Sequence, residues 1–301
     1  MKNKISIIIP CYNSANTIKK TIENLRTSLR FCKSQEYELI IVNDGSNDGL
    51  IGLLKNEQNV LLINHDTNKG LSAARNTGIR KSTGSLIIFL DSDIYVKEDW
   101  IFKMLSVIQK KNIIGVTGSL GPFPNKRLTL LEKYLFSKYR GHQVKNQNTP
   151  LDYKSFVFSN TIIKKAALDQ TGFFNENLKH YGGEDTELAI RLNKLYPTQM
   201  RKCHAYSIHD AGKTLKKYLM NVFEYGKYNF IKIVSMHPDY KNDLGYTFIF
   251  SWKGKIIFNN LSVKIVTALM LIFQHPLLVK FLVINSFIEG ARQGFQNDNN
   301  S

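Results

Sequence analysis

A regular alternation of short apolar segments with helical segments constrains the fold of this 301-residue chain most strongly. Wholly apolar segments, each followed by polar residues, are expected as strands at residues 5–9, 37–42, 60–64 and 86–90, and Pro10 is expected to end the first of them. Strands that are apolar on both faces are typical of a parallel sheet covered by helices. Ligands of such sheets bind at the carboxyl ends of the strands. The sequence therefore predicts an α/β fold with its ligand site at that edge.

The rest of the chain continues the same pattern less regularly. Strands are expected at 113–117 and 156–163, and an amphipathic helix is expected at 215–234. A strong helix is expected at 184–196, because its apolar side chains recur at helical spacing. Residues 121–150 are expected to form a helix followed by a mobile loop.

The fourth expected strand ends in two carboxylates, Asp91 and Asp93, on either side of Ser92. Two carboxylates so close together repel each other unless a cation lies between them. A divalent metal that also binds a diphosphate is the natural candidate, because hard cations prefer oxygen ligands. The alternative is a solvated turn, since Asp and Ser are ordinary turn residues. Both interpretations are open from this segment alone.

The chain is strongly basic, with a net charge of +17, and the excess is uneven. Residues 1–120 contain 16 basic and 11 acidic residues, whereas residues 121–301 contain 25 and 13. Such an excess indicates an anionic partner, which could be a nucleotide, a phospholipid surface, a lipid-phosphate acceptor or a nucleic acid. General solubility is the alternative explanation.

Cysteine spacing and hydropathy bear on the compartment. Cys11, Cys32 and Cys203 follow no zinc or redox spacing, and we expect them to be reduced thiols of a cytoplasmic protein. The apolar run before Pro10 is too short for a signal-peptide core. No run of 18 uninterrupted apolar residues occurs, so no transmembrane helix is expected.

Five motifs occur in order along the chain: IIIPCYN (7–13), IVNDGSNDG (41–49), NKGLSAARNTGI (68–79), FLDSD (89–93) and GGEDTEL (182–188). Together they resemble the motifs of glycosyltransferase family 2, over about residues 4–235. The resemblance implies the GT-A fold, which is a Rossmann-like, mostly parallel sheet flanked by helices. It also implies a nucleotide-sugar donor and transfer with inversion of configuration.

The resemblance also suggests a division of the chain. Residues 1–235 would be the GT-A catalytic domain, with a nucleotide-binding half at 1–118 and an acceptor-binding half at 119–235. Residues 236–301 would be a helical, apolar and basic C-terminal extension.

The donor-binding residues implied by the resemblance lie in the first three motifs. Asp44 would accept a hydrogen bond from a uracil N–H, and Pro10 and Tyr12 would form the wall against the base. Arg75 would contact the nucleotide and help balance the charge of the diphosphate. The alternatives are that Asp44 only builds a tight turn and that Arg75 is a surface arginine. Asn43 stands where most members carry a second aspartate.

The same resemblance implies a metal, Mn²⁺ or Mg²⁺, that neutralises the leaving diphosphate. Asp93 would bind it directly. Asp91 would belong to the metal site as well and would contact the ribose of the donor or a metal-bound water, and Ser92 would also bind the donor. His209 would be a further metal ligand, although a lone histidine is usually structural and His204 is a nearby competitor.

Glu184 and Asp185 follow two glycines and begin the expected helix. Asp185 shares a helix face with Leu188 and Leu192, so it should point towards the interior or a cleft. The helix N-terminus favours its ionised form by about 0.3–1 kcal/mol. Asp185 is therefore the candidate general base for an acceptor hydroxyl, with Glu184 shaping the site or contacting the acceptor. The alternative is a pair of ordinary helix-start acids.

The C-terminal stretch 256–288 is apolar, but Lys264, Pro276 and Lys280 interrupt it. Each half is short for spanning a bilayer. The halves could lie on a membrane as amphipathic helices, helped by the lysines between Lys213 and Lys255. They could instead pack on the catalytic domain or on a partner subunit.

The sequence thus predicts an inverting, metal-dependent glycosyltransferase that moves a sugar from a UDP-sugar to a hydroxyl of a glycan or lipid-linked saccharide. The expected setting is surface polysaccharide or lipopolysaccharide assembly, in the cytoplasm or peripherally at the inner face of the cell membrane. The alternative is a catalytically inactive, glycosyltransferase-like scaffold or partner-binding subunit. Asp91, Asp93 and Asp185 argue against that alternative, because a scaffold does not need them.

Other classes fit less well. A nucleotidyltransferase would need a glycine-rich phosphate loop with a lysine near the first strand, and an NAD-dependent oxidoreductase would need G-x-G-x-x-G there. The sequence after the first strand, Pro10 to Asn13, is neither. A nucleic-acid partner is not expected, because acidic strand ends would repel phosphates in the absence of a metal.

Overall fold

The computed structural model describes residues 4–32, 36–140, 149–210 and 212–298, and the chain divides into two compact units. Unit 1 comprises residues 1–125, 142–177 and 184–211, and unit 2 comprises 126–141, 178–183 and 212–301. Residues 212–235 therefore group with the C-terminal helices rather than with the sheet. Most of the loop expected before residue 150 lies outside the described residues.

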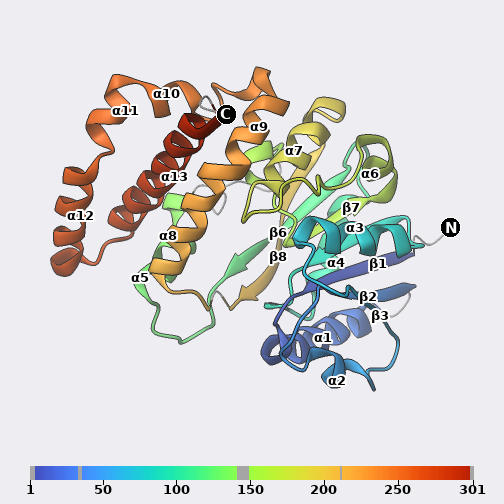
Figure 1. Cartoon of the computed structure of the whole chain (residues 1–301). Helices are drawn as coiled ribbons and strands as arrows, with labels where there is room; N and C mark the ends of the chain where they lie inside the picture. The colour runs from blue at the N-terminus through green and yellow to red at the C-terminus, as the bar shows by residue number, and fades with distance from the viewer. Residues whose placement is uncertain (1–3, 33–35, 141–148, 211, 299–301) are drawn as a thin grey trace. The chain divides into compact units, whose positions relative to one another are not determined.

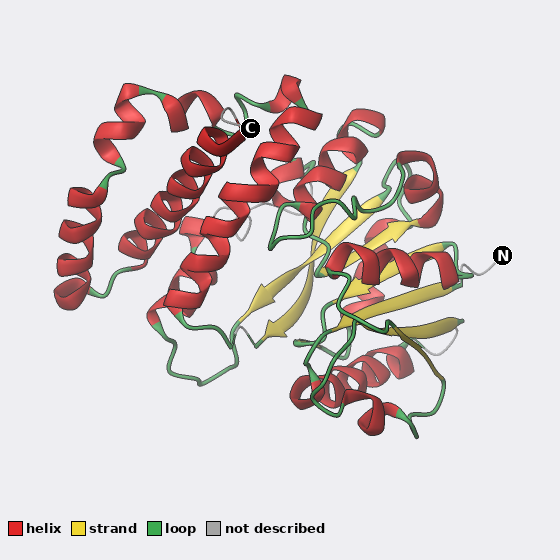
Figure 2. Ribbon diagram, viewed as in Figure 1, coloured by secondary structure: helices red, strands yellow, loops and turns green. Residues whose placement is uncertain are grey.

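Unit 1 contains an eight-stranded mixed sheet with the order β3-β2-β1-β4-β7-β6-β8-β5 (Figures 1 and 2). The strands are β1 Ile5–Cys11, β2 Tyr37–Asn43, β3 Val60–Asn64, β4 Leu86–Leu90, β5 Ile94–Val96, β6 Gly115–Gly121, β7 Asn160–Lys164 and β8 Met200–His209. The first four are parallel, as predicted, and β6 and β8 are parallel to each other. β7 runs antiparallel to β4 and β6, and β5 runs antiparallel to β8.

This order brings the ends of several strands to one edge of the sheet. The carboxyl ends of β1 to β4 lie there because the four strands are parallel. The amino end of β7 joins them, since Leu90 pairs with Asn160. The carboxyl end of β8 joins them through the pairing of Ile94 with His209. The predicted site residues at the strand ends therefore share an edge.

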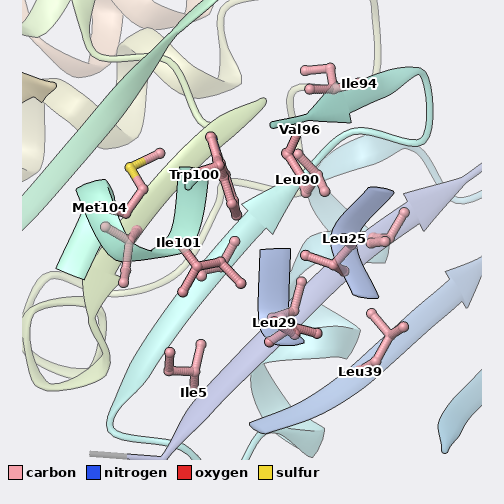
Figure 3. Close-up of a cluster of buried hydrophobic side chains, with 14 of the residues drawn as sticks. Ile5, Leu25, Leu29, Leu39, Leu90, Ile94, Val96, Trp100, Ile101 and Met104 are labelled. Atoms are coloured by element: carbon pink, nitrogen blue, oxygen red, sulfur yellow. The ribbon is translucent and has the colours of Figure 1, made fainter. Parts of the chain in front are cut away.

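The central strands of the sheet, such as β1 and β4, are apolar on both faces, so helices must cover both faces. The helices of unit 1 are α1 Ala15–Phe31, α2 Leu50–Leu54, α3 Leu71–Lys81, α4 Trp100–Ile108, α6 Lys165–Thr171 and α7 Glu184–Leu195, with a 3-10 turn, η3, at Tyr153–Ser155. Ile5, Ile7 and Ile9 of β1 pack in one buried cluster with side chains of α1 and α4 (Figure 3). The side chain of Ile8 points to the other face, where α3 packs.

Gly78 allows α3 to lie close to the sheet. A Cβ atom at this position would stand 2.4 Å from Cγ2 of Ile8, which no real contact allows. The glycine therefore fixes the separation between α3 and β1. Arg75 lies one turn earlier on the same helix, so its depth in the structure depends on this close packing.

Strand β1 runs two residues farther than the sequence predicts, through Pro10 to Cys11. Pro10 pairs with Val42 of β2, whereas the pairing of β1 with β4 ends at Ile8. A proline has no backbone N–H to donate to a neighbouring strand, so it is disfavoured where strands pair on both sides. It is tolerated here because β4 no longer pairs with this part of β1.

Unit 2 is helical. Its elements are α5 Leu130–Leu135, η1 Lys138–Arg140, α8 Leu215–Glu224, η4 Tyr225–Phe230, α9 Ile231–Met236, η5 Pro238–Tyr240, α10 Tyr246–Phe250, α11 Trp252–Ile257, α12 Asn260–Phe273 and α13 Pro276–Asp298. The amphipathic segment predicted as one helix is α8 to α9, and η4 within it is a π-helical stretch. Along the described ranges, no helix is both long and apolar enough to cross a membrane.

Candidate functional site

The loops after β1 and β2 are joined to each other at the carboxyl edge of the sheet. The backbone N–H of Asn13 donates to Oγ of Ser46, and Oδ1 of Asn13 accepts from the N–H of Asn47. Tyr12, directly before Asn13 in the chain, has 54% of its surface exposed, whereas Pro10 is buried in the strand. The exposed ring is available to a flat ligand, as the prediction for Tyr12 requires.

Asp44 follows β2 and is almost wholly buried. Its Oδ1 accepts from the N–H of Lys69 at 2.9 Å, and its Oδ2 accepts from the N–H of Gly70 at 2.8 Å. His65 Nδ1 lies 2.6 Å from the same Oδ1, while His65 Nε2 lies 2.9 Å from Oγ1 of Thr77. Asp44 therefore orders the loop that leads into α3, in addition to its predicted role toward a nucleotide.

Asp91 and Asp93 have different partners. Asp91 Oδ1 accepts from Nη2 of Arg75 at 3.2 Å. Asp93 Oδ2 lies 3.5 Å from Nε2 of His209, because the backbone of Asp93 accepts from Asp210 at the end of β8. Ser92 contributes its backbone carbonyl, which accepts from the hydroxyl of Thr21. The two carboxylates thus face different groups, and the charge of Asp93 still helps to raise the pKa of Asp91.

The predicted metal ligands meet only in part. Within the described ranges, no three His, Cys, Asp or Glu side chains converge as a metal centre. Asp93 and His209 nevertheless supply one oxygen and one nitrogen donor side by side at the sheet edge. Such a pair fits a metal that takes its other ligands from phosphate oxygens and water, as Mg²⁺ commonly does.

Arg75 gathers three carboxylates of unit 1. It is 1% exposed, and its Nη1 donates to Oδ1 of Asp185 at 2.7 Å. Nη1 also lies 3.7 Å from Oε1 of Glu184, and Nη2 reaches Asp91. Asp185 is held from a second side, since its Oδ2 accepts from the N–H of Phe158 at 3.0 Å. One guanidinium therefore links the start of α7 with the end of β4.

Burial and like charge shift the ionisation of this cluster. Burial and the neighbouring Asp185 raise the pKa of Glu184 to about 7, against the charge of Arg75. Burial also raises the pKa of Asp91, and Arg75 opposes that rise. Burial alone would lower the pKa of Arg75, but Asp185, Asp91 and Glu184 outweigh it and raise that pKa further. The cluster therefore holds a permanent cation among acids of unequal strength.

The sequence missed some residues that the structure places at this edge. His65 carried no signal by residue type, but it follows directly on the expected third strand, whose end shares an edge with Asp44. Phe158 acts through its backbone N–H, which no residue type reveals. The pairing of Arg75 with Asp185 joins residues 110 positions apart, beyond the reach of local patterns.

Known proteins resemble this chain in sequence. Residues 6–172 match the model described as glycosyl transferase family 2. Glycosyltransferase AglE of Haloferax volcanii is 30% identical over 179 residues, which cover 58% of this chain and 57% of AglE. The uncharacterized glycosyltransferase YfnE of Bacillus subtilis is 24% identical over 291 residues, which cover 78% of this chain and 73% of YfnE.

Solved structures resemble the fold. Mannosyltransferase PcManGT from Pyrobaculum calidifontis, in complex with GDP-Man and Mn²⁺, has a TM-score of 0.63 and 14% identity over 99% of this chain and 88% of its own. S. aureus TarS 1-349 in complex with UDP has a TM-score of 0.52 and 18% identity over 100% of this chain and 92% of its own. At such low identity these likenesses bear on the fold alone, and they confirm the predicted GT-A architecture.

Proposed function

The chain belongs to glycosyltransferase family 2, and we propose that this glycosyltransferase moves a sugar, with inversion, from a UDP-sugar to a hydroxyl of a glycan or lipid-linked saccharide. The proposal includes a divalent metal at the donor diphosphate and a setting in surface polysaccharide or lipopolysaccharide assembly. It also includes peripheral contact of the protein with the inner face of the cell membrane.

One observation carries the proposal: a single buried guanidinium, that of Arg75, bonds both Asp91 and Asp185. Asp91 belongs to the acidic pair expected at the donor, and Asp185 is the expected base. A donor and an acceptor bound at these two carboxylates would lie within a few ångströms of each other. Such proximity is what a direct displacement requires.

The transfer step uses Asp185 as general base. The acceptor hydroxyl donates its proton to the Asp185 carboxylate while its oxygen forms a bond to the anomeric carbon of the sugar. The bond from that carbon to the phosphate oxygen breaks, and UDP leaves with the electron pair. Attack comes from the face opposite the leaving group, so the configuration inverts. Arg75 and the N–H of Phe158 hold Asp185 in one orientation for this step.

Asp93 and His209 would hold the metal, and Asp91 would contact the ribose or a water in its coordination shell. A bound Mn²⁺ or Mg²⁺ would act as a Lewis acid on the diphosphate. The chain itself positions these side chains. The pairing of β5 with β8 holds Asp93 beside His209, and the ion pair with Arg75 holds Asp91.

Asp44 supports the choice of uracil. A carboxylate offers about four acceptor positions. Two backbone N–H groups and His65 occupy three of them, which leaves one for the ring N–H of a base. Pro10 and Tyr12 would flank the base on the side of β1. The neighbouring structures bind either UDP or GDP-Man, so the preference rests on Asp44.

A thermal-shift panel of UDP, GDP, CDP, TDP and NAD, each with and without Mn²⁺, tests the proposal. We expect stabilisation by UDP that depends on metal, and we expect Asp93→Ala to lose the metal dependence. A preference for another nucleotide would overturn the role given to Asp44. No response to any nucleotide would overturn the proposed donor and favour the inactive scaffold.

A further inference from the structure

Helix α12 of unit 2 is mostly apolar, with Lys264 as its one charged residue, but it lies open to solvent. Every residue of α12 is described, and none is buried. Leu271, Ile272 and Phe273 are 82%, 74% and 65% exposed. Apolar side chains that recur along a helix in this number are normally covered by protein or by a membrane. With 14 residues, α12 is shorter than the roughly 20 residues that span a bilayer. Its apolar side chains can therefore be covered by a membrane only if the helix lies along the membrane surface.

The helix before it has the composition of a membrane–water interface. Trp252 and Ile256 of α11 are 67% and 63% exposed, and Lys253 and Lys255 lie between them. Exposed tryptophan and lysine beside an apolar helix are typical of segments that lie in the plane of a membrane surface. The surface formed by α11 and α12 is called the α11–α12 surface below.

Charge selects the partner of the α11–α12 surface. Residues 212–298 contain eleven basic and five acidic residues. A second copy of the chain would bring Lys253, Lys255 and Lys264 against the same lysines, which repel one another. An anionic bilayer offers hydrocarbon for α12 and negative headgroups for the lysines.

In unit 2, α13 packs against both α8 and α12 (Figure 1). Residues of these three helices line a cavity of about 700 Å³. Its size falls within the roughly 300–1,000 Å³ of ordinary ligand pockets. Its wall is mostly hydrocarbon, and its charged lining residues are Lys216, Lys227 and Glu224, which leave one net positive charge. The apolar lining includes Leu215, Leu219, Phe223, Met270 and Leu282. An apolar chain attached to an anionic group matches this combination.

We propose that unit 2 docks on an anionic phospholipid bilayer through the α11–α12 surface, with the cavity receiving one hydrocarbon chain of a phospholipid. The inference deepens the membrane contact of the proposed function and gives it a location and a ligand class. Its tests need no sugar donor. Membrane docking can therefore fail while the proposed transfer activity stands, and transfer can fail while docking stands.

Trp252 provides the first test, because the chain has two tryptophans and the other, Trp100, is fully buried in unit 1. The full chain is mixed with vesicles of phosphatidylcholine alone or of phosphatidylcholine with phosphatidylglycerol. We expect the emission of Trp252 to shift to the blue, and brominated lipid chains to quench it, with the anionic vesicles. The variant Trp252→Phe should show neither change.

Two sets of variants separate the apolar and the charged parts of the surface. Leu271→Gln with Ile272→Gln should abolish the shift, whereas the matched pair Ile51→Gln with Leu61→Gln, exposed on unit 1, should leave it intact. Lys253→Gln with Lys255→Gln should weaken partitioning about fivefold per lysine, from about 1 kcal/mol each. An unchanged Trp252 spectrum in anionic vesicles would overturn the docking. A blue shift without vesicles that grows with protein concentration would overturn it in favour of self-association.

A short-chain phosphatidylglycerol, kept monomeric, tests the cavity separately. Titration calorimetry should show saturable binding of one molecule per chain. Thr267→Phe with Met270→Phe, which fills the cavity, should remove that binding while anionic vesicles still shift Trp252. Equal binding to the filled variant would overturn the cavity as the site of the lipid chain.

Discussion

Arg75 determines how the carboxylates of unit 1 are arranged. Its planar guanidinium reaches Asp185 with one nitrogen and Asp91 with another, and it is 1% exposed. A buried charge of this kind is stable only while its partners stay in place. The residue expected to contact the nucleotide therefore also positions the candidate base, and its contact with a nucleotide stays a prediction.

Replacing Arg75 by lysine distinguishes the effect of its positive charge from the effect of its contacts with two carboxylates. Arg75→Lys keeps a cation but loses the two-pronged contact, so we expect transfer to fall about 10–100-fold. Arg75→Met leaves the acids without a counter-charge and should lower the free energy of unfolding by about 3–5 kcal/mol. Initial rates and urea unfolding measure both. Arg80→Lys, on the exposed side of the same helix, is the control. Equal rates in the two lysine variants would remove Arg75 from the positioning role.

Glu184 should make the stability of the fold depend on pH. Burial and Asp185 raise its pKa from 4.5 to about 7 in the folded chain. The folded state then binds the proton more tightly than the unfolded state. This contribution to stability is complete below about pH 4.5 and is lost as the pH rises through about 7.

Urea unfolding between pH 4.5 and 8 measures this effect. The difference between wild type and Glu184→Gln should change across that range, by at most about 1.4 kcal/mol per pH unit for one proton. Glu98→Gln, an exposed site, serves as the control. Parallel curves for wild type and Glu184→Gln would show that the pKa of Glu184 is not raised.

At the scale of elements, the apolar strands and their polar ends could be predicted from the sequence because those signals are local. The bounds of β3 and β4 agree with the expected segments. The antiparallel placement of β7 and β5 could not be predicted, because pairing partners are chosen by tertiary packing rather than by local pattern. The meeting of Asp93 with His209 depends on that pairing.

Gly78 is a single residue that determines how closely α3 packs against β1. Gly78→Ala would place a methyl group 2.4 Å from Ile8, and we expect the cost of about 1–3 kcal/mol to outweigh the helix propensity gained. Urea unfolding measures the loss, and a cycle with Ile8→Ala should show coupling. In Gly52→Ala the new methyl group meets no described atom within 4 Å, so this variant should be neutral or stabilising. A neutral Gly78→Ala would contradict the close packing.

At the scale of the whole molecule, the sequence motifs lie in unit 1, apart from the two glycines that precede Glu184. The division expected at residue 235 rested on the extent of a resemblance, whereas the contacts of the chain place α8 to α9 with the C-terminal helices. Membership of the family follows from residues 6–172, most of which lie in unit 1.

The most direct test of the account is single-turnover transfer by Asp185→Asn, with UDP binding measured on the same sample. Loss of a general base should slow the transfer by about 10²–10⁴-fold. UDP binding should stay within a few fold of wild type, and Asp169→Asn, exposed on α6, should be unaffected. Transfer that persists in Asp185→Asn, or loss of UDP binding together with transfer, would contradict Asp185 as the base.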